Sequence, residues 1–324
     1  MSSDRQAVPD DHRATMVAAA RQYYLEDRSK SQIAESLGVS RFKVARLLTM
    51  AREQGVVTIR IDDRAMPVPE LADKLARALN LHRAIVVETP QDPTEARRLV
   101  GEAGAAHLGR TLTAGEVVGM AWGRTLTAMS AAMPPLPEVD VVQLTGAVGS
   151  DLEMSPVEIV RRVALNAGGS ATPIFAPLVV DDARTADSLR RQPDVGRAIR
   201  MFDAVTTAVV AVGSIDPSTS QLWDSLDRVD QERLLRAGAV AEVVASLVDD
   251  NGEMIDPEFD QRCIAISAEQ LRRTPRVLAI AAGAEKARAV AAIARGRLCT
   301  EIVTDRSLAQ EVLDLMGAAP GADQ

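Results

Sequence analysis

The spacing of apolar residues changes along the chain. Up to residue 54, apolar positions recur every three or four residues, which predicts helices with one buried face. Ser31 and Ser40 are the predicted N-caps of the second and third helices, and Gly38 ends the second. The alternating residues after the third helix predict a strand, which would form a wing. The predicted ranges are Thr15–Glu26, Ser31–Leu37 and Arg41–Gln54 for the helices and Val56–Ile61 for the strand.

Two of these helices flank a short turn that contains a glycine, which is the arrangement of a helix-turn-helix. In that motif the first residues of the second helix reach base edges in the major groove, and other basic residues contact phosphates. The alternative is a helical hairpin that contacts another protein. The predicted base-edge residues are Ser40, Arg41, Phe42, Lys43 and Arg46, and the predicted phosphate contacts are Lys30, Ser31 and Arg52.

A polar segment with two prolines, Asp62–Pro69, interrupts the pattern and predicts a domain boundary. We expect a DNA-binding domain over residues 1–62, a linker over 63–69 and a larger domain over 70–324. The larger domain opens with a predicted helix, Glu70–Leu81, whose leucines form one stripe. We expect this stripe to pack on a neighbouring element or on a partner subunit.

In the larger domain, short β-branched runs alternate with helical stretches. This alternation predicts an α/β domain in which helices cover both faces of a parallel, Rossmann-like sheet. The predicted strands are Ala84–Val87, Glu116–Ala121, Val139–Leu144, Thr172–Phe175, Ala204–Val212, Ala239–Val248 and Arg276–Ala281. The predicted helices include Thr94–Leu112, Thr125–Met133, Pro156–Ala167, Val195–Met201 and Glu285–Arg295.

The residues that follow each predicted strand form the candidate ligand site, because ligands of such sheets bind at the carboxyl ends of the strands. Glycines, predicted helix N-termini and a lysine occur there, and free N–H groups at a helix N-terminus suit an anion. Carboxylates at the same edge suit hydroxyl groups. The predicted ligand is therefore a phosphorylated or polyhydroxylated small molecule. The candidates are Gly123, Arg124, Thr125, Thr145, Gly146, Gly213, Ser214, Asp216, Asp249–Glu253, Gly283 and Lys286.

Several of these residues also have a structural interpretation. Lys286 can be a solvated lysine in a first helical turn, and Arg124 and Thr125 can be simple capping residues. The Asp249–Gly252 segment has the composition of an ordinary turn. The glycines of Gly101–Gly104 lie inside a predicted helix rather than after a strand, so we interpret them as packing residues and not as a nucleotide loop.

Charge is distributed unevenly along the chain. Residues 1–64 contain 11 Lys and Arg against 9 Asp and Glu, whereas the whole chain has a net charge of −8. A basic segment on an acidic body is typical of a nucleic-acid-binding domain attached to a domain of another kind. Chance clustering of basic residues on a solvated helix face is the alternative.

Composition excludes several classes of protein. Apolar residues make up 47% and charged residues 25% of the chain, as in ordinary soluble globular proteins. No apolar stretch approaches the ~18–20 residues of a membrane span, and Met1–Asp11 lacks the apolar region of a signal peptide. Cys263 and Cys299 are predicted to be reduced and buried, and the histidines show no zinc-binding spacing. We therefore expect a cytoplasmic protein without metal or cofactor.

These motifs together resemble the SorC family of sugar-responsive bacterial transcriptional regulators, from about Arg13 to Met316. The N-terminal part matches through Ser31-Gln-Ile-Ala…Leu37-Gly-Val-Ser-Arg41…Val44-Ala-Arg-Leu-Leu48…Ala51-Arg-Glu-Gln-Gly-Val56. The larger domain matches through Trp122-Gly-Arg-Thr-Leu126, Val142-Gln-Leu-Thr-Gly146, Ala176-Pro-Leu178, Val212-Gly213 with Asp216, Asp250-Asn-Gly-Glu253…Ile255-Asp256, Gly283-Ala-Glu-Lys-Ala287 and Ile302-Val-Thr-Asp305.

The resemblance implies an effector domain folded like sugar-phosphate isomerases, a homodimer or homotetramer, and control by a sugar or sugar phosphate. Two positions depart from the family pattern: Ala282 stands where a glycine is usual, and Arg306 stands where an acidic residue is common. The identity of the ligand therefore does not follow from the family. By position, the resemblance places Gly123, Arg124, Thr125, Thr145, Gly146, Asp250, Glu253 and Lys286 in the effector site.

The sequence thus predicts a regulator of carbohydrate or polyol metabolism that binds operator DNA, has no membrane partner and has no catalytic residues. One alternative is a sugar-phosphate isomerase or deaminase with an accessory DNA-binding domain, in which Asp216, Asp250 and Glu253 would supply the carboxylates. A second alternative is a DNA-binding protein whose effector site has decayed, which would respond to no ligand.

Overall fold

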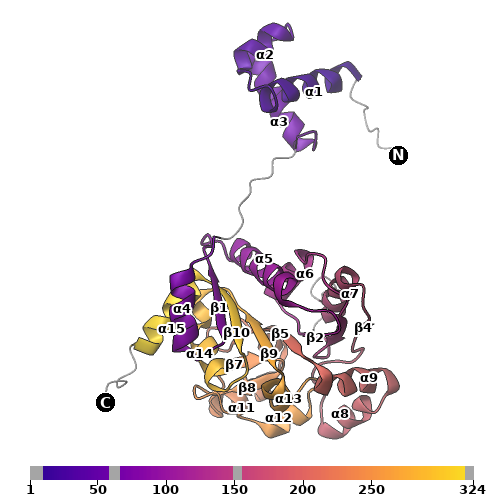
Figure 1. Ribbon diagram of the computed structural model, residues 1–324, viewed down its shortest axis with the longest axis vertical. Coiled ribbons are helices and arrows are strands. Elements are labelled where there is room, and N and C mark those ends of the chain that lie inside the picture. The colour runs from indigo at the N-terminus through magenta and orange to yellow at the C-terminus, as the bar shows by residue number, and fades with distance from the viewer. Residues whose placement is uncertain (1–9, 58–65, 149–154, 318–324) are drawn as a thin grey trace. The chain divides into compact units, whose positions relative to one another are not determined.

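The computed structural model describes residues 10–57, 66–148 and 155–317, and the chain forms two compact units, residues 1–63 and 64–324 (Figure 1). Over residues 10–57 of the first unit, three helices surround a small apolar core that includes Met16, Ile33, Val44 and Leu47. The helices are α1 (Asp10–Tyr24), α2 (Lys30–Ser36) and α3 (Arg41–Glu53).

Hydrogen bonds to two serines define where α2 and α3 begin. Ser40 caps α3 as predicted, since its hydroxyl accepts from the N–H of Lys43 at 3.2 Å. The prediction for α2 is wrong: Ser29 caps it, in a capping box with Gln32, and Ser31 lies inside the helix. The wing strand predicted at Val56–Ile61 falls largely on residues 58–65, which lie outside the described residues.

The second unit is built on a seven-stranded parallel sheet in the order β1-β10-β9-β5-β2-β3-β4, which confirms the predicted α/β class. The register of the central pair aligns Gly119 with Ala208. β10 was not predicted as a strand, and the strand predicted at Thr172–Phe175 is only two residues long. The strands are β1 (Arg83–Val87), β2 (Val117–Met120), β3 (Asp140–Gln143), β4 (Ala171–Thr172), β5 (Thr207–Ala211), β9 (Arg276–Ile280) and β10 (Glu301–Asp305).

A separate three-stranded antiparallel sheet corrects the prediction of one long strand at Ala239–Val248. That run folds back on itself as a hairpin, because Val244 and Ala245 adopt positive φ angles of 47° and 69° and reverse the chain. The sheet contains β6 (Gly213–Ser214), β7 (Ala241–Val243) and β8 (Ser246–Val248) in that order. The segment after β8 follows no strand of the parallel sheet, and a Cβ on Gly252 would overlap the backbone of Gly296, so this segment packs there instead.

Helices cover both faces of the parallel sheet, with α5, α6 and α7 on one face and α4, α14 and α15 on the other (Figure 1). The helices up to β5 are α4 (Pro69–Ala78), α5 (Pro93–Thr111), α6 (Arg124–Ala131), α7 (Pro156–Ala167), α8 (Ala183–Arg190), α9 (Pro193–Met201) and η1 (Phe202–Ala204). Those after β5 are α10 (Gln221–Ser225), α11 (Arg228–Arg236), α12 (Pro257–Gln261), α13 (Ala268–Arg273), η2 (Ala284–Lys286), α14 (Ala287–Arg295) and α15 (Arg306–Gly317).

The packing of the second unit confirms three predictions, for a glycine in α5, for the two cysteines and for the leucine stripe of α4. A Cβ atom on Gly101 would lie 2.7 Å from the backbone nitrogen of Met129, so this glycine allows α5 to approach α6 closely. Cys263 and Cys299 are buried free thiols. The leucine stripe of the predicted Glu70–Leu81 helix is buried, and α4 packs against β1 and α15.

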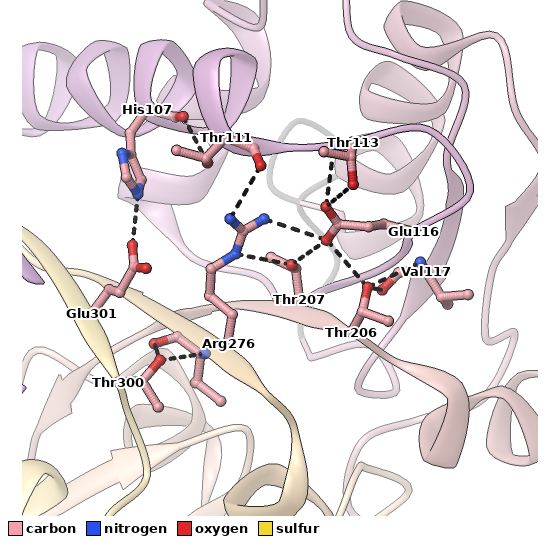
Figure 2. A network of polar contacts seen from close by, with 11 residues as sticks. His107, Thr111, Thr113, Glu116, Val117, Thr206, Thr207, Arg276, Thr300 and Glu301 are labelled. Atoms are coloured by element: carbon pink, nitrogen blue, oxygen red, sulfur yellow. Dashed lines mark hydrogen bonds and ion pairs between the residues drawn. The ribbon is translucent and has the colours of Figure 1, made fainter. Parts of the chain in front are cut away.

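A polar network closes the amino-terminal edge of the sheet (Figure 2). Glu116 accepts a hydrogen bond from the hydroxyl of Thr207 at 2.8 Å and lies 3.4 Å from the guanidinium of Arg276. Burial alone would raise the pKa of Glu116, but hydrogen bonds, chiefly from Thr113 and Thr207, lower it. His107 contacts Glu301 at 2.6 Å in the same region. These groups satisfy one another, so we interpret this edge as structural.

Candidate functional site

The strand order of the parallel sheet reverses between the neighbouring strands β2 and β5. From β2 the chain continues to β3 and β4 on one side, whereas from β5 it continues to β9 and β10 on the other. Such a reversal opens a crevice at the carboxyl ends of the two strands, where α/β proteins bind ligands. A pocket lies there, with about 620 Å³ of empty space when the open solvent at its mouth is included.

We call this the switch-point pocket. Segments that follow β2, β5 and β9 line it, together with α5 and the antiparallel sheet. Its lining residues are Arg97, Ala121, Trp122, Gly123, Arg124, Thr125, Ala211, Val212, Gly213, Thr219, Ser220, Gln221, Glu242, Val244, Ala282, Glu285 and Lys286.

The N-terminus of α6 forms one wall of the switch-point pocket. Gly123 precedes the helix with a φ of 143°, and a Cβ there would lie 2.9 Å from that of Ala211, so glycine lets the loop after β2 approach β5. No side chain caps α6, so N–H groups of its first turn stay available for an anion. Arg124 donates to the carbonyl of Thr219 at 3.2 Å, and Thr125 is buried.

Lys286 approaches the pocket from η2 and is only 9% exposed, so its interpretation as a solvated lysine is wrong. Its ammonium donates to the carbonyl of Val212, at the end of β5, at 2.8 Å. Burial lowers the pKa of Lys286 to about 8, and the positive charges of Arg124 and Arg97 act in the same direction against Glu285 and Glu242. A lysine held in this way is poised to gain a negatively charged partner.

Arg97 is a third cation in the pocket, and no sequence motif indicated it. It projects from α5, and burial followed by the charge of Arg124 lowers its pKa. Arg97 donates to the hydroxyl of Thr94 at 3.3 Å. Among the described residues, Arg97, Arg124 and Lys286 have only neutral hydrogen-bond partners and no ion pair with a carboxylate. Glu242 and Glu285 also line the pocket but form no ion pair with these three cations, so the pocket has an excess of positive charge.

Glu242 is a second charged residue of the pocket that was not among the predicted ligand-site residues. It lies on β7, and both of its oxygens are engaged: one accepts from the N–H of Ala245 at 2.9 Å and the other from the hydroxyl of Ser220 at 3.0 Å. Burial raises its pKa, against these hydrogen bonds and the charge of Lys286. The available signal was one acidic residue inside the apolar run Val240–Val244. A buried carboxylate next to a cationic site suits the hydroxyl groups of a polar ligand.

The structure brings five of the predicted ligand-site residues together in the pocket, namely Gly123, Arg124, Thr125, Gly213 and Lys286. Gly283 instead faces a neighbouring pocket, where its N–H donates to the carboxylate of Asp305 at 2.7 Å. The other predicted residues lie elsewhere: Thr145, Gly146, Ser214, Asp216, Asp249, Asp250, Asn251, Gly252 and Glu253 are not among the lining residues.

The predicted residues that lie outside the pocket have other contacts or are exposed. Asp250 pairs with Arg288 at 2.6 Å, a hydrogen bond that lowers the pKa of Asp250. Gly146 passes so close to Pro177 that a Cβ would lie 2.5 Å from its carbonyl oxygen. Thr145 is fully buried, and its hydroxyl has no hydrogen-bond partner among the described residues. Asp216 and Glu253 are exposed.

The first unit presents basic side chains on one helix. Arg41, Lys43, Arg46 and Arg52 are all exposed on α3, and none forms an ion pair with a carboxylate of the described residues. Phe42 lies among them and is 88% exposed. Ser31 is exposed on α2, and the ammonium of Lys30 lies 5.8 Å from the ring centroid of Tyr23. An exposed basic helix after a tight turn fits the phosphates and bases of a DNA groove.

Two classes of site are not found in the described ranges. No helix there is long and apolar enough to cross a membrane. No group of His, Cys, Asp or Glu residues there could hold a metal ion.

A family described as "Putative sugar-binding domain" matches residues 64–314. An uncharacterized transcriptional regulator, YjhU of Escherichia coli K12, is 29% identical over 300 residues, covering 90% of this chain and 92% of that protein. The deoxyribonucleoside regulator of Bacillus subtilis is 26% identical over 302 residues, covering 92% and 96%. The crystal structure of the full-length sorbitol operon regulator SorC from Klebsiella pneumoniae has a TM-score of 0.71 at 23% identity, covering 94% of this chain and 99% of that one.

Proposed function

This chain belongs to the sugar-binding-domain family of SorC-type transcriptional regulators, and from that premise we propose that a phosphorylated sugar or polyol controls its binding to operator DNA. In this proposal, the first unit binds DNA and the second unit binds the effector. The protein then regulates genes of carbohydrate or polyol metabolism in the cytoplasm.

The observation that supports a phosphorylated effector is the convergence of Arg97, Arg124 and Lys286 without a carboxylate partner. Burial, followed by the repulsion between these cations, lowers the pKa values of Lys286 and Arg97. A phosphate would relieve that repulsion and accept charge-assisted hydrogen bonds, which are stronger than neutral ones. The uncapped N-terminus of α6 would hold the same group. Glu242 would then accept hydrogen bonds from the hydroxyls of the sugar.

We further propose that two or four copies of the chain assemble, so that their α3 helices reach paired half-sites on the DNA. The effector can change DNA binding only through its different affinity for two arrangements of the DNA-binding units. Such coupling typically amounts to ~1–3 kcal/mol. A footprint on the operator that contains no paired half-sites would contradict the symmetric assembly.

Thermal unfolding of the full-length chain tests the effector class, with matched free and phosphorylated sugars and polyols as probes. A ligand at ~100 times its Kd adds ~2.7 kcal/mol to stability, which shifts the midpoint by a few degrees. We expect shifts from phosphorylated compounds only, and Lys286→Met should reduce them by about half or more. Lys74→Met, which removes an exposed lysine of α4, is the matched control and should leave them unchanged. Shifts produced only by unphosphorylated compounds would overturn the phosphate assignment.

An enzyme remains the second candidate, because a buried lysine of lowered pKa and a buried glutamate of raised pKa line the same pocket. We favour the regulator: Glu242 is held by two hydrogen bonds, and no histidine of the described residues lines the pocket. Incubating the purified chain with sugar phosphates and analysing the products separates the two candidates. Turnover that Glu242→Gln abolishes would make the protein an enzyme.

A further inference from the structure

Phe42 is a large apolar side chain in an unusual position. It is 88% exposed and takes no part in the apolar core of the first unit. That core receives α3 through Val44, Leu47, Leu48 and Ala51. At 100° per residue, Phe42 lies on the opposite side of α3, and Arg46, four residues later, shares its face. The stability of the fold therefore does not explain a phenylalanine there.

The charges around Phe42 indicate what covers this face. Arg41 and Lys43 flank it and Arg46 follows one turn later, and all three are exposed without an ion pair to a described carboxylate. An apolar protein partner would desolvate these cations without pairing them, which is unfavourable. A DNA groove instead offers phosphates to the cations and base edges to the residues at the start of the helix.

The major groove has one apolar feature, the methyl group on C5 of thymine, and phenylalanine is among the side chains that contact it. We propose that Phe42 packs against a thymine methyl group of the operator and thereby determines specificity at that base pair. This inference rests on the proposed DNA-binding function and assigns a base to one residue of that surface. The neighbouring cations hold the helix in the groove, and Phe42 distinguishes thymine from the other bases.

Replacing thymine with uracil tests the contact, because it removes the methyl group and leaves base pairing unchanged. The full-length protein first selects a binding site from a random duplex library. Each thymine of that site is then replaced singly by uracil, and the Kd is measured by fluorescence anisotropy. We expect one position in each half-site where uracil weakens binding about fourfold, which corresponds to the ~0.8 kcal/mol of burying one methyl-sized group. In Phe42→Ala the same replacement should have no effect.

Two further variants make the result specific. Phe42→Leu retains an apolar contact and should retain part of the response to uracil. Leu25→Ala removes another exposed apolar residue of the first unit and should behave like the wild type. All variants should unfold at the same temperature, because neither side chain is buried.

The outcomes separate this inference from the proposed function. Equal responses to uracil in the wild type and in Phe42→Ala would overturn the methyl contact while DNA binding stands. A uniform loss of affinity in Phe42→Ala, with no thymine affected, would also overturn it and point to a wedge between base pairs. A protein that selects no sequence and binds no duplex would overturn both the inference and the DNA-binding function.

Discussion

Replacing Lys286 with methionine should make the ligand-free protein more stable and at the same time weaken binding of the effector. The ammonium of Lys286 is buried, and its pKa is about 8, compared with an ordinary value of 10.5. The difference between these two values corresponds to ~3 kcal/mol by which the buried charge destabilises the fold. Methionine fills a similar space without a charge, so the variant lacks this destabilisation.

Loss of the hydrogen bond to Val212 opposes this gain in stability. The carbonyl oxygen of Val212 accepts from Lys286 at 2.8 Å and would be left without that donor. An unsatisfied buried group costs ~1–3 kcal/mol, so the expected net gain is at most ~2 kcal/mol. Binding of a phosphorylated effector should weaken by ~10- to 150-fold, since a hydrogen bond to a charged group contributes ~1.5–3 kcal/mol.

The pH dependence of the stability difference between the wild type and Lys286→Met tests whether the buried charge is its cause. Below pH 8 the lysine is charged in both folded and unfolded protein, and the full destabilisation is present. Between about pH 8 and 10.5 the folded state has released the proton and the unfolded state still holds it, so the stability of the wild type rises with pH. The advantage of Lys286→Met should therefore be largest at pH 7 and shrink towards pH 10.

Urea unfolding of the full-length chain at the two pH values measures this difference, with Lys74→Met as the control that changes neither stability nor its pH dependence. A Lys286→Met variant that is less stable than the wild type at pH 7 would refute the reasoning. So would an advantage that is the same at both pH values, because the buried charge would then not be its source.

Three further predictions concern other parts of the fold. Glu116→Ala should reduce stability by ~1–3 kcal/mol in urea unfolding at pH 7, because it leaves the partners of Glu116 unsatisfied. Since the pKa of Glu116 is lowered, this loss should shrink as the pH falls below the ordinary value of 4.5, and an unchanged difference at low pH would contradict the network. Gly101→Ala should cost ~1–3 kcal/mol by forcing α5 away from α6, and it should also weaken effector binding, which calorimetry measures; unchanged affinity would show that α6 does not carry the site. Arg41→Ala should weaken binding to the operator more than to random DNA, whereas Arg52→Ala should weaken both alike in anisotropy titrations; equal losses would remove this division of roles.

Local sequence signals predicted most elements of the parallel sheet. The strands β2, β5 and β9 are buried runs of apolar residues between helical stretches, a pattern that few other structures produce. The order of the strands is not contained in that pattern. The reversal between β2 and β5, and the meeting of Arg97 with Lys286, arise from pairing between distant segments, so the sequence alone did not predict Arg97.

The antiparallel hairpin shows how one turn can mislead a prediction. Val244 and Ala245 reverse the chain with positive φ angles, a role that glycine and asparagine usually fill. The run Ala239–Val248 therefore read as one strand, and the residues after it were assigned to the carboxyl edge of the sheet. Asp250 and Glu253 lie outside the pocket for this reason, whereas Glu242, inside the run, lies in it.

The start of α2 was predictable and was assigned to the wrong serine. Ser29 and Ser31 are both suitable N-caps, but only Ser29 has a glutamine three residues later, and the pair Ser29 and Gln32 forms the capping box. The shift of two residues turns Ser31 outward on the first turn of the helix. Its predicted phosphate contact stays a prediction that DNA-binding measurements must test.

The two hydrogen bonds that fix Glu242 determine how the pocket can discriminate between ligands. Ser220 holds one oxygen and the N–H of Ala245 holds the other, so the carboxylate cannot rotate to follow a misplaced hydroxyl group. A ligand must present its hydroxyls in the configuration that this orientation accepts. Epimers that differ at a single carbon then differ in affinity, because in one of them a hydroxyl group buried on binding has no acceptor. Stereochemistry, rather than size or charge alone, becomes the property by which such a site tells one sugar from another.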